Sequence, residues 1–208
     1  MRIGLLGEDT THDAVLRGLG RRWCPRATLD TGVFRGKTRQ RRRRELADEL
    51  QRLMCTLRCD CVVILLDADN GKWSEAVADE KGKLPERYRD LSLVKIGAPE
   101  RNIECWLCAA VDDFCAQTGA DRDQVQQARE NDPKGLAQAA LQRAAEAGAK
   151  SVQDFTEAYV AGAPLAYWLH MNCFKAFYDE CRGLAQAQGC PDLPNEADAK
   201  ARAEPAAA

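Results

Sequence analysis

Two short apolar segments of this chain each lead directly into acidic residues. Residues 2–6 (RIGLL) precede an acidic pair at 8–9, and residues 62–66 (VVILL) precede the sequence Asp67-Ala68-Asp69. A continuous apolar run rich in β-branched residues is typical of a strand buried on both faces of a parallel sheet. Because ligands of open α/β sheets gather at the carboxyl ends of the strands, these acidic residues are candidates for a ligand site.

Asp67 and Asp69 have a spacing that suits a metal-binding pair. If the extended backbone continues past the strand, both carboxylates point to the same side and repel each other unless a cation lies between them. Mg²⁺ and Mn²⁺ are the ions that such oxygen ligands usually bind. The same residues also fit a simple turn, because Asp69-Asn70-Gly71 is a good turn sequence. From this segment alone, both interpretations stay open.

The first half of the chain alternates between strand-like and helix-like patterns. Beyond the two strands above, the patterns predict helices over about 10–22, 38–57 and 74–81, strands over 27–29 and 91–96, and a helix that begins at Pro99-Glu100. Strands and helices that alternate with short turns predict an α/β fold, with a mostly parallel sheet covered by helices on both faces.

The second half of the chain is expected to be helical. Beyond Asp112 the composition shifts to Ala, Gln and charged residues, and most of the remaining aromatic residues lie between 152 and 184. We therefore predict an α/β core over 1–118, a helical extension packed on it over 119–190, and a disordered tail over 191–208.

Three segments of the chain resemble a known family. They are residues 7–13 (GEDTTHD), 65–69 (LLDAD) and 98–107 (APERNIECWL). Together they resemble the Toprim fold, a Rossmann-like fold, and most closely the small Toprim-like proteins related to nucleases of the overcoming-lysogenization-defect type. The third segment is similar to the Pro-Glu-x-x-x-Glu-x-Trp-Leu helix start of that group, and the resemblance covers roughly the first two thirds of the chain. One departure is Asp9, where the family usually has a glycine, which leaves the backbone path at the first cluster open.

The resemblance implies a divalent-metal-dependent nuclease that hydrolyses phosphodiester bonds of DNA or RNA. Glu8 would be a metal ligand or general base, and Asp67 and Asp69 would hold the Mg²⁺ or Mn²⁺ ion that polarises the scissile phosphate. Members of the group resemble effectors of bacterial anti-phage defence that act beside a separate ATPase, and this chain has no Walker motif of its own. The alternative is a Toprim-like regulatory subunit with a weak metal site, which docks an ATPase or nucleic acid.

Three further carboxylates are candidates for the same site. Glu100 and Glu104 are four residues apart on the expected helix and could supply a second metal position or, in the case of Glu104, orient water. Acidic residues in a first helical turn also favour the helix dipole without any catalytic role. Asp13 and His12 lie where relatives often carry a second carboxylate, so one of them could face the metal, and Asp13 is the candidate ligand. His12 is otherwise a polar residue in a first helical turn.

Residues 35–44 (RGKTRQRRRR) form the strongest charge signal of the chain. Consecutive arginines on a helix point in every direction, so this segment is expected to be an exposed helix start that contacts phosphates. Two alternatives compete with this interpretation: the cations are simply solvated, or they pair with an acidic partner protein. The candidate nucleic-acid-binding residues are Arg35, Lys37, Arg39, Arg41, Arg42, Arg43, Arg44 and, near the end of the expected fourth strand, Lys95.

The composition of the chain limits which classes of protein it can belong to. The chain has 208 residues, a net charge of -2 and 30 % charged residues, which is typical of a soluble domain with a small addition. It has neither an apolar stretch of membrane-spanning length nor the pattern of a signal peptide, so we expect a cytoplasmic protein with no membrane partner. In that compartment its ten cysteines are expected to be free, buried or metal-linked. The aromatic-rich C-terminal helices could also serve as a homo-oligomer interface.

Overall fold

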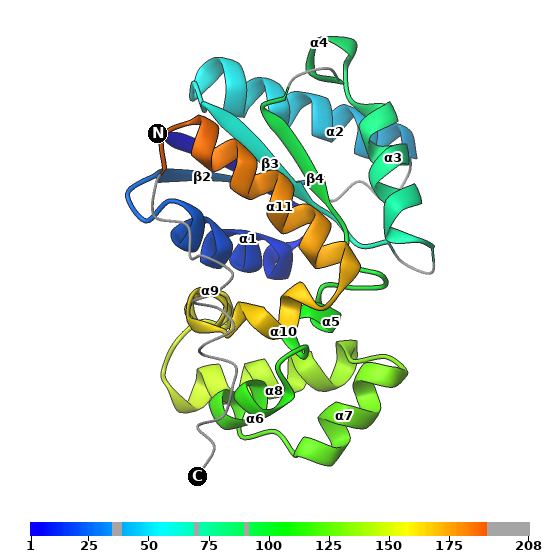
Figure 1. Cartoon of the computed structure of the whole chain (residues 1–208), viewed down its shortest axis with the longest axis vertical. Coiled ribbons are helices and arrows are strands. Elements are labelled where there is room, and N and C mark those ends of the chain that lie inside the picture. Colours follow the sequence, from blue (N-terminus) through cyan, green and yellow to red (C-terminus); the bar gives the residue numbers. More distant parts are fainter. Residues whose placement is uncertain (35–38, 69–70, 90–91, 191–208) are drawn as a thin grey trace.

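The computed structural model describes residues 1–34, 39–68, 71–89 and 92–190. Four parallel strands form one sheet in the order β2-β1-β3-β4 (Figure 1). The strands are β1 (Arg2–Gly7), β2 (Thr28–Val33), β3 (Cys61–Leu65) and β4 (Val94–Gly97). The predicted α/β class with a parallel sheet is confirmed.

The sheet is buried on both faces, as its apolar strands predicted. Leu5 and Val63 face a layer that contains α1 (Thr10–Trp23) and α11 (Asn172–Ala187). Leu6 and Ile64 face the opposite layer, which is built from α2 (Arg39–Gln51), the π-helix η1 (Arg52–Thr56), α3 (Trp73–Lys83) and α4 (Glu86–Arg89). Alternate residues of each strand therefore enter two separate apolar clusters, because successive side chains of a strand point to opposite faces.

The second half of the described chain is helical and packs on the sheet side that carries α1. Its elements are α5 (Glu104–Leu107), α6 (Val111–Thr118), α7 (Arg122–Glu130), α8 (Lys134–Ala147), α9 (Val152–Gly162), α10 (Leu165–Leu169) and the returning α11. Figure 1 shows α11 running back along the sheet, so the extension shares one apolar cluster with the core. The predicted tail, 191–208, lies outside the described residues.

The contact between α1 and α9 requires a glycine. A Cβ atom at Gly18 would lie 2.7 Å from the carbonyl oxygen of Glu157 and 2.7 Å from Cβ of Val160. These distances are shorter than van der Waals contact, so the two helices approach closely only because residue 18 has no side chain. This contact holds the helical extension against the first helix of the core.

The helix predicted to begin at Pro99-Glu100 begins later. Helix α5 starts at Glu104, and Glu100 lies in the bend that follows β4. The prediction that Glu100 and Glu104 share one helical face is therefore wrong. The physical reason is that the neighbouring Arg101 and Asn102 form hydrogen bonds with residues 130–132, which hold this segment outside the helix.

One expectation about the cysteines is also corrected. A disulfide joins Cys24, which follows α1, to Cys190, which follows α11, whereas the other eight cysteines are free. The two residues are 166 positions apart, so no local spacing in the sequence indicated the pair.

Among the described residues, every helix is too short or too polar to cross a bilayer.

Candidate functional site

The carboxyl ends of β1 and β3 form a topological switch point. The chain leaves β1 through α1 toward β2, and it leaves β3 through α3 toward β4, on the opposite face of the sheet. Such a point opens a crevice that commonly holds the ligand of an α/β protein. Glu8 follows β1 and Asp67 follows β3, and the backbone N–H of Asp67 donates a hydrogen bond of 2.9 Å to Oε2 of Glu8. The two predicted site residues, which are 59 positions apart, are thus brought together.

A buried histidine connects the two acidic clusters. The Nδ1 atom of His12 lies 2.8 Å from Oδ1 of Asp9, and its Nε2 atom lies 3.0 Å from Oδ1 of Asp67. The imidazole is fully buried, so these carboxylates are its hydrogen-bond partners in place of water. The sequence analysis considered His12 only as a residue that could face the metal or as a polar residue of a first helical turn. Its spacing of three residues from a capping Asp is a signal that could have indicated the link.

The local sequence explains how Asp9 reaches the histidine. Asp9 is the N-cap of α1, where its Oδ1 accepts hydrogen bonds from the N–H groups of Thr11 at 2.8 Å and His12 at 3.0 Å. Its backbone is extended, with φ of -148°. Since this conformation does not require a glycine, the departure from the family pattern at residue 9 leaves the start of α1 intact.

The buried His12 and the neighbouring Asp9 have shifted pKa values. Burial lowers the pKa of His12, but the hydrogen bonds and charges of Asp67 and Asp9 outweigh it and raise the pKa to about 9. Burial raises the pKa of Asp9, but the hydrogen bonds and charge of His12 and the helix N–H groups lower it to about 2. An imidazolium therefore lies between two carboxylates at neutral pH.

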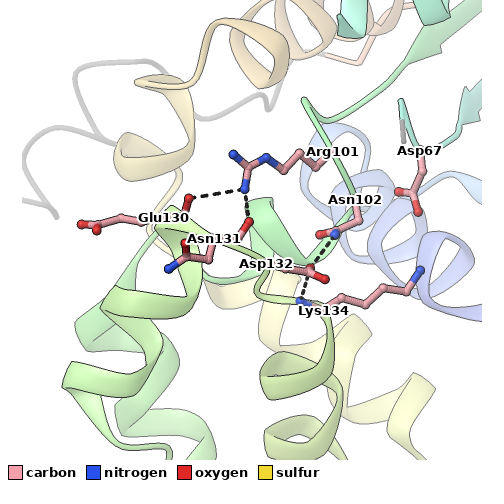
Figure 2. A pocket seen from close by; sticks show the side chains of 7 residues that line it. All are labelled: Asp67, Arg101, Asn102, Glu130, Asn131, Asp132 and Lys134. Atoms are coloured by element: carbon pink, nitrogen blue, oxygen red, sulfur yellow. Dashed lines mark hydrogen bonds between the residues drawn. The ribbon is translucent and has the colours of Figure 1, made fainter. Parts of the chain in front are cut away.

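Asp67 also contacts a third part of the chain and opens to a cavity. Its Oδ1 accepts a hydrogen bond of 2.9 Å from the backbone N–H of Ile103, just before α5. The side chain is 11 % exposed, so it is held on one side and accessible on the other. The cavity has a volume of about 570 Å³ and is lined by Asp67, Arg101, Asn102, Glu130, Asn131, Asp132 and Lys134 (Figure 2).

Two cationic side chains, Arg101 and Lys134, line the same cavity as Asp67. Arg101 donates through Nη1 to the carbonyl oxygens of Glu130 and Asn131, and no hydrogen bond to a described residue uses its Nε or Nη2. The backbone N–H of Lys134 donates to Oδ1 of Asp132 at 3.0 Å, and Figure 2 shows its amine extending to the side of the cavity where Asp67 lies. The sequence analysis missed both cations: Arg101 lies between the candidate residues Glu100 and Glu104 but was not itself considered, and Lys134 belongs to a helix 67 positions from Asp67.

Glu104, a predicted catalytic residue, is buried near the same site. Its Oε1 accepts a hydrogen bond of 2.7 Å from Nε2 of Gln138, whereas its Oε2 is buried and has no hydrogen-bond partner among the described residues. Burial raises the pKa of the Glu104 carboxyl, and the charge of Asp67 raises it further.

Of the other predicted carboxylates, Glu100 and Asp13 have different surroundings. Glu100 is exposed in the bend after β4 and lines a separate cavity. Asp13 lies among Arg17, Thr31 and Glu157, and burial raises its pKa. Asp69 lies outside the described residues.

The predicted nucleic-acid-binding residues are spread over two faces. Nζ of Lys95 lies 4.0 Å from Oε2 of Glu180 on α11. On α2, Arg41 pairs with Glu45 at 2.7 Å, and Arg44 approaches Asp48 at 3.9 Å. Arg43 is exposed. Residues Arg35 and Lys37, and the side chains of Arg39 and Arg42, lie outside what the structure describes.

Only some of the predicted metal ligands come together among the described residues. Among them, no group of three or more His, Cys, Asp or Glu side chains converges to hold an ion. Glu8 and Asp67 form a linked pair of carboxylates, and Asp69 would be the next ligand in the predicted set.

Comparison of the chain with protein-family models, with curated proteins and with solved structures found no match.

Proposed function

We propose that this chain is a divalent-metal-dependent phosphodiesterase that acts on DNA or RNA at the carboxyl ends of β1 and β3. The observation that carries the proposal is the link between Glu8 and Asp67 across the switch point, beside a cavity that also holds Arg101 and Lys134. Hydrolysis of a phosphodiester needs carboxylates to hold the ion and cationic groups to hold the phosphate. This site has both.

The chemistry of the donor set fits Mg²⁺ or Mn²⁺. Carboxylate oxygens are the preferred ligands of both ions. The buried Oε2 of Glu104, which has no hydrogen-bond partner among the described residues, supports the fit, because it is an acceptor near Asp67 that those residues leave unsatisfied. In this proposal Glu8, Asp67 and Asp69 hold the ion, and the ion makes the scissile phosphate more electrophilic.

The remaining residues orient Asp67 and attract the substrate. His12 and the N–H of Ile103 both bind Oδ1 of Asp67, which fixes the carboxylate and directs its other oxygen away from them. We assign phosphate binding to Lys134 in place of Lys95, because Lys134 lines the cavity above Asp67 whereas Lys95 lies near Glu180. Arg101 is suited to hold a neighbouring phosphate through the nitrogens it does not use for residues 130 and 131.

The test is cleavage of labelled single- and double-stranded DNA and RNA by the purified chain, with Mg²⁺, Mn²⁺ or EDTA. We expect metal-dependent cleavage that is lost in Glu8→Gln and Asp67→Asn. Asp123→Asn, at an exposed position on α7, is the matched control and should cleave as the wild type does. Cleavage that persists in Asp67→Asn, or no cleavage of any of these nucleic acids by the folded chain, would contradict the proposal.

One observation favours a second function, a regulatory subunit that docks an ATPase or nucleic acid. The imidazolium of His12 already compensates the charges of Asp9 and Asp67, so these carboxylates are stable without an ion. Titration of the chain with Mn²⁺ in a calorimeter separates the two functions. Saturable binding that Asp67→Asn abolishes supports the enzyme, and absence of binding together with absence of cleavage supports the regulatory subunit.

A further inference from the structure

A second cavity adjoins the one above Asp67. It has a volume of about 410 Å³ and is lined by Gly71, Lys72, Trp73, Ser74, Glu100 and Arg101. Arg101 lines both cavities, so they share this residue near the carboxyl ends of β3 and β4. Together they offer a binding surface longer than a single phosphate needs.

The two cavities differ in the chemistry of their walls. Every described residue that lines the first cavity is charged or carries an amide, which suits phosphate and sugar hydroxyls. The second cavity adds an aromatic residue, Trp73, the first residue of α3. An indole ring offers a flat apolar surface on which a nucleobase can stack.

Trp73 differs from the other tryptophans of the chain. Trp23, Trp106 and Trp168 are 2 %, 0 % and 0 % exposed, whereas Trp73 is only partly buried. It packs against both apolar clusters, which fixes its position. The close ring pairs among the described residues are formed by other aromatic residues, so no described ring stacks on the indole of Trp73.

Charged groups surround this indole. Nζ of Lys72 is highly exposed and lies 3.5 Å from Oε1 of Glu75, a surface pair that a phosphate can displace at little cost. Arg101 supplies a second cation, and Glu100 supplies an acceptor that suits a base amino group. The cavity therefore presents a stacking surface with cations beside it, which is the combination that binds unpaired nucleotides.

We propose that the two cavities together bind single-stranded nucleic acid, with one unpaired base stacked on Trp73 and the adjoining phosphate held by Arg101. This inference rests on the proposed function, since it extends the strand whose scissile phosphate lies at Asp67. In a duplex the bases are already paired and stacked, and they cannot enter the second cavity unless the strands open. The substrate class is therefore a single strand or an unpaired end, bound with little sequence preference.

The first test uses the intrinsic fluorescence of the full chain in EDTA, so that no cleavage occurs. Because the other three tryptophans are buried, a single-stranded oligothymidylate should quench the emission of Trp73 selectively. A hairpin duplex of the same length should quench it much less, and Trp73→Phe should remove the quenching. Equal quenching by the duplex, or no quenching by the single strand, would overturn the inference.

The second test measures binding by anisotropy of a labelled oligonucleotide. Trp73→Leu should weaken binding about tenfold or more, and Trp73→Phe, which keeps a ring, should retain most of it. Tyr167→Leu is the control, because Tyr167 is an aromatic residue that is 41 % exposed and lines a different cavity. Circular dichroism checks that each variant is folded, and the quenching of the wild type tests the inference without any variant.

The two proposals fail in different ways. Quenching and single-strand binding without cleavage in Mg²⁺ or Mn²⁺ would support the binding site and contradict the nuclease. Cleavage that Asp67→Asn abolishes but Trp73→Leu leaves unchanged, with no preference for single strands, would support the nuclease and overturn the inference about its substrate.

Discussion

The imidazole of His12 joins Asp9 and Asp67, with Nε2 at 3.0 Å from Oδ1 of Asp67 and Nδ1 at 2.8 Å from Oδ1 of Asp9. This single side chain links the start of α1 to the end of β3, two elements that flank the switch point. A buried cation between two carboxylates is costly to disrupt, because removing it leaves the negative charges facing each other.

His12→Ala should therefore lower the free energy of unfolding by about 2–3 kcal/mol, less than for a fully buried ion pair because Asp9 is partly exposed. His170→Ala is the matched control, since His170 is exposed and should change the stability by no more than about 0.5 kcal/mol. Urea denaturation of both variants at neutral pH measures the difference. Equal stability of the two variants would show that the buried cation does not hold the site together.

The same group predicts how stability depends on pH in metal-free buffer. The pKa of His12 is raised from 6.5 to about 9, so its stabilisation is fully present below about pH 6.5 and is lost as the pH rises toward 9. The pKa of Asp9 is lowered to about 2, so its stabilisation is present above pH 3.8 and is lost as the pH falls toward 2. Urea midpoints measured across this range should decline at both ends, and His12→Gln should remove the alkaline decline.

Lys134→Ala should reduce kcat/KM for nucleic-acid cleavage by about tenfold or more, a loss that corresponds to about 1.4 kcal/mol of transition-state stabilisation. The reason is that Lys134 lines the cavity above Asp67. Lys95→Ala is the control and should have little effect, because Lys95 lies near Glu180 on α11. A larger loss in Lys95→Ala than in Lys134→Ala would indicate that Lys95 on β4, and not Lys134, binds the phosphate.

Gly18→Ala should destabilise the chain by about 1–3 kcal/mol, because the added Cβ would overlap Glu157 and Val160 of α9. Gly82→Ala provides the contrast, since a Cβ at this helical position meets nothing within 4 Å. It should stabilise the chain by about 0.5–1 kcal/mol through helix propensity. Thermal unfolding of both variants would show the opposite signs.

Cys190→Ser should lower the free energy of unfolding by about 2–4 kcal/mol, because it opens a loop closed by residues 166 positions apart. Dithiothreitol should destabilise the wild type by a similar amount and leave Cys190→Ser unchanged. If reductant changed both proteins equally, its effect would come from other cysteines.

The α/β architecture was predictable because it depends on local patterns. The apolar runs at 2–6 and 62–66 are continuous in the sequence, and burial on both faces of a parallel sheet is the way to remove all of their side chains from water. The pairing of Glu8 with Asp67 followed from the same reasoning, since the carboxyl ends of neighbouring parallel strands meet at one edge. The helix start at residues 99–100 was wrong because a local pattern does not register the hydrogen bonds that Arg101 and Asn102 form with a distant loop.

The strands, their order of appearance and the positions of Glu8 and Asp67 thus follow from short-range regularities of the chain. The environment of Asp67 does not, because its partners His12 and Ile103 are 55 and 36 positions away and the cations of its cavity come from the bend after β4 and from α8. Which side chain reaches a carboxylate depends on how helices pack on the sheet, and that packing is a property of the whole core. The chemistry of the strand ends is therefore local, whereas the shape and charge of the site belong to the folded chain.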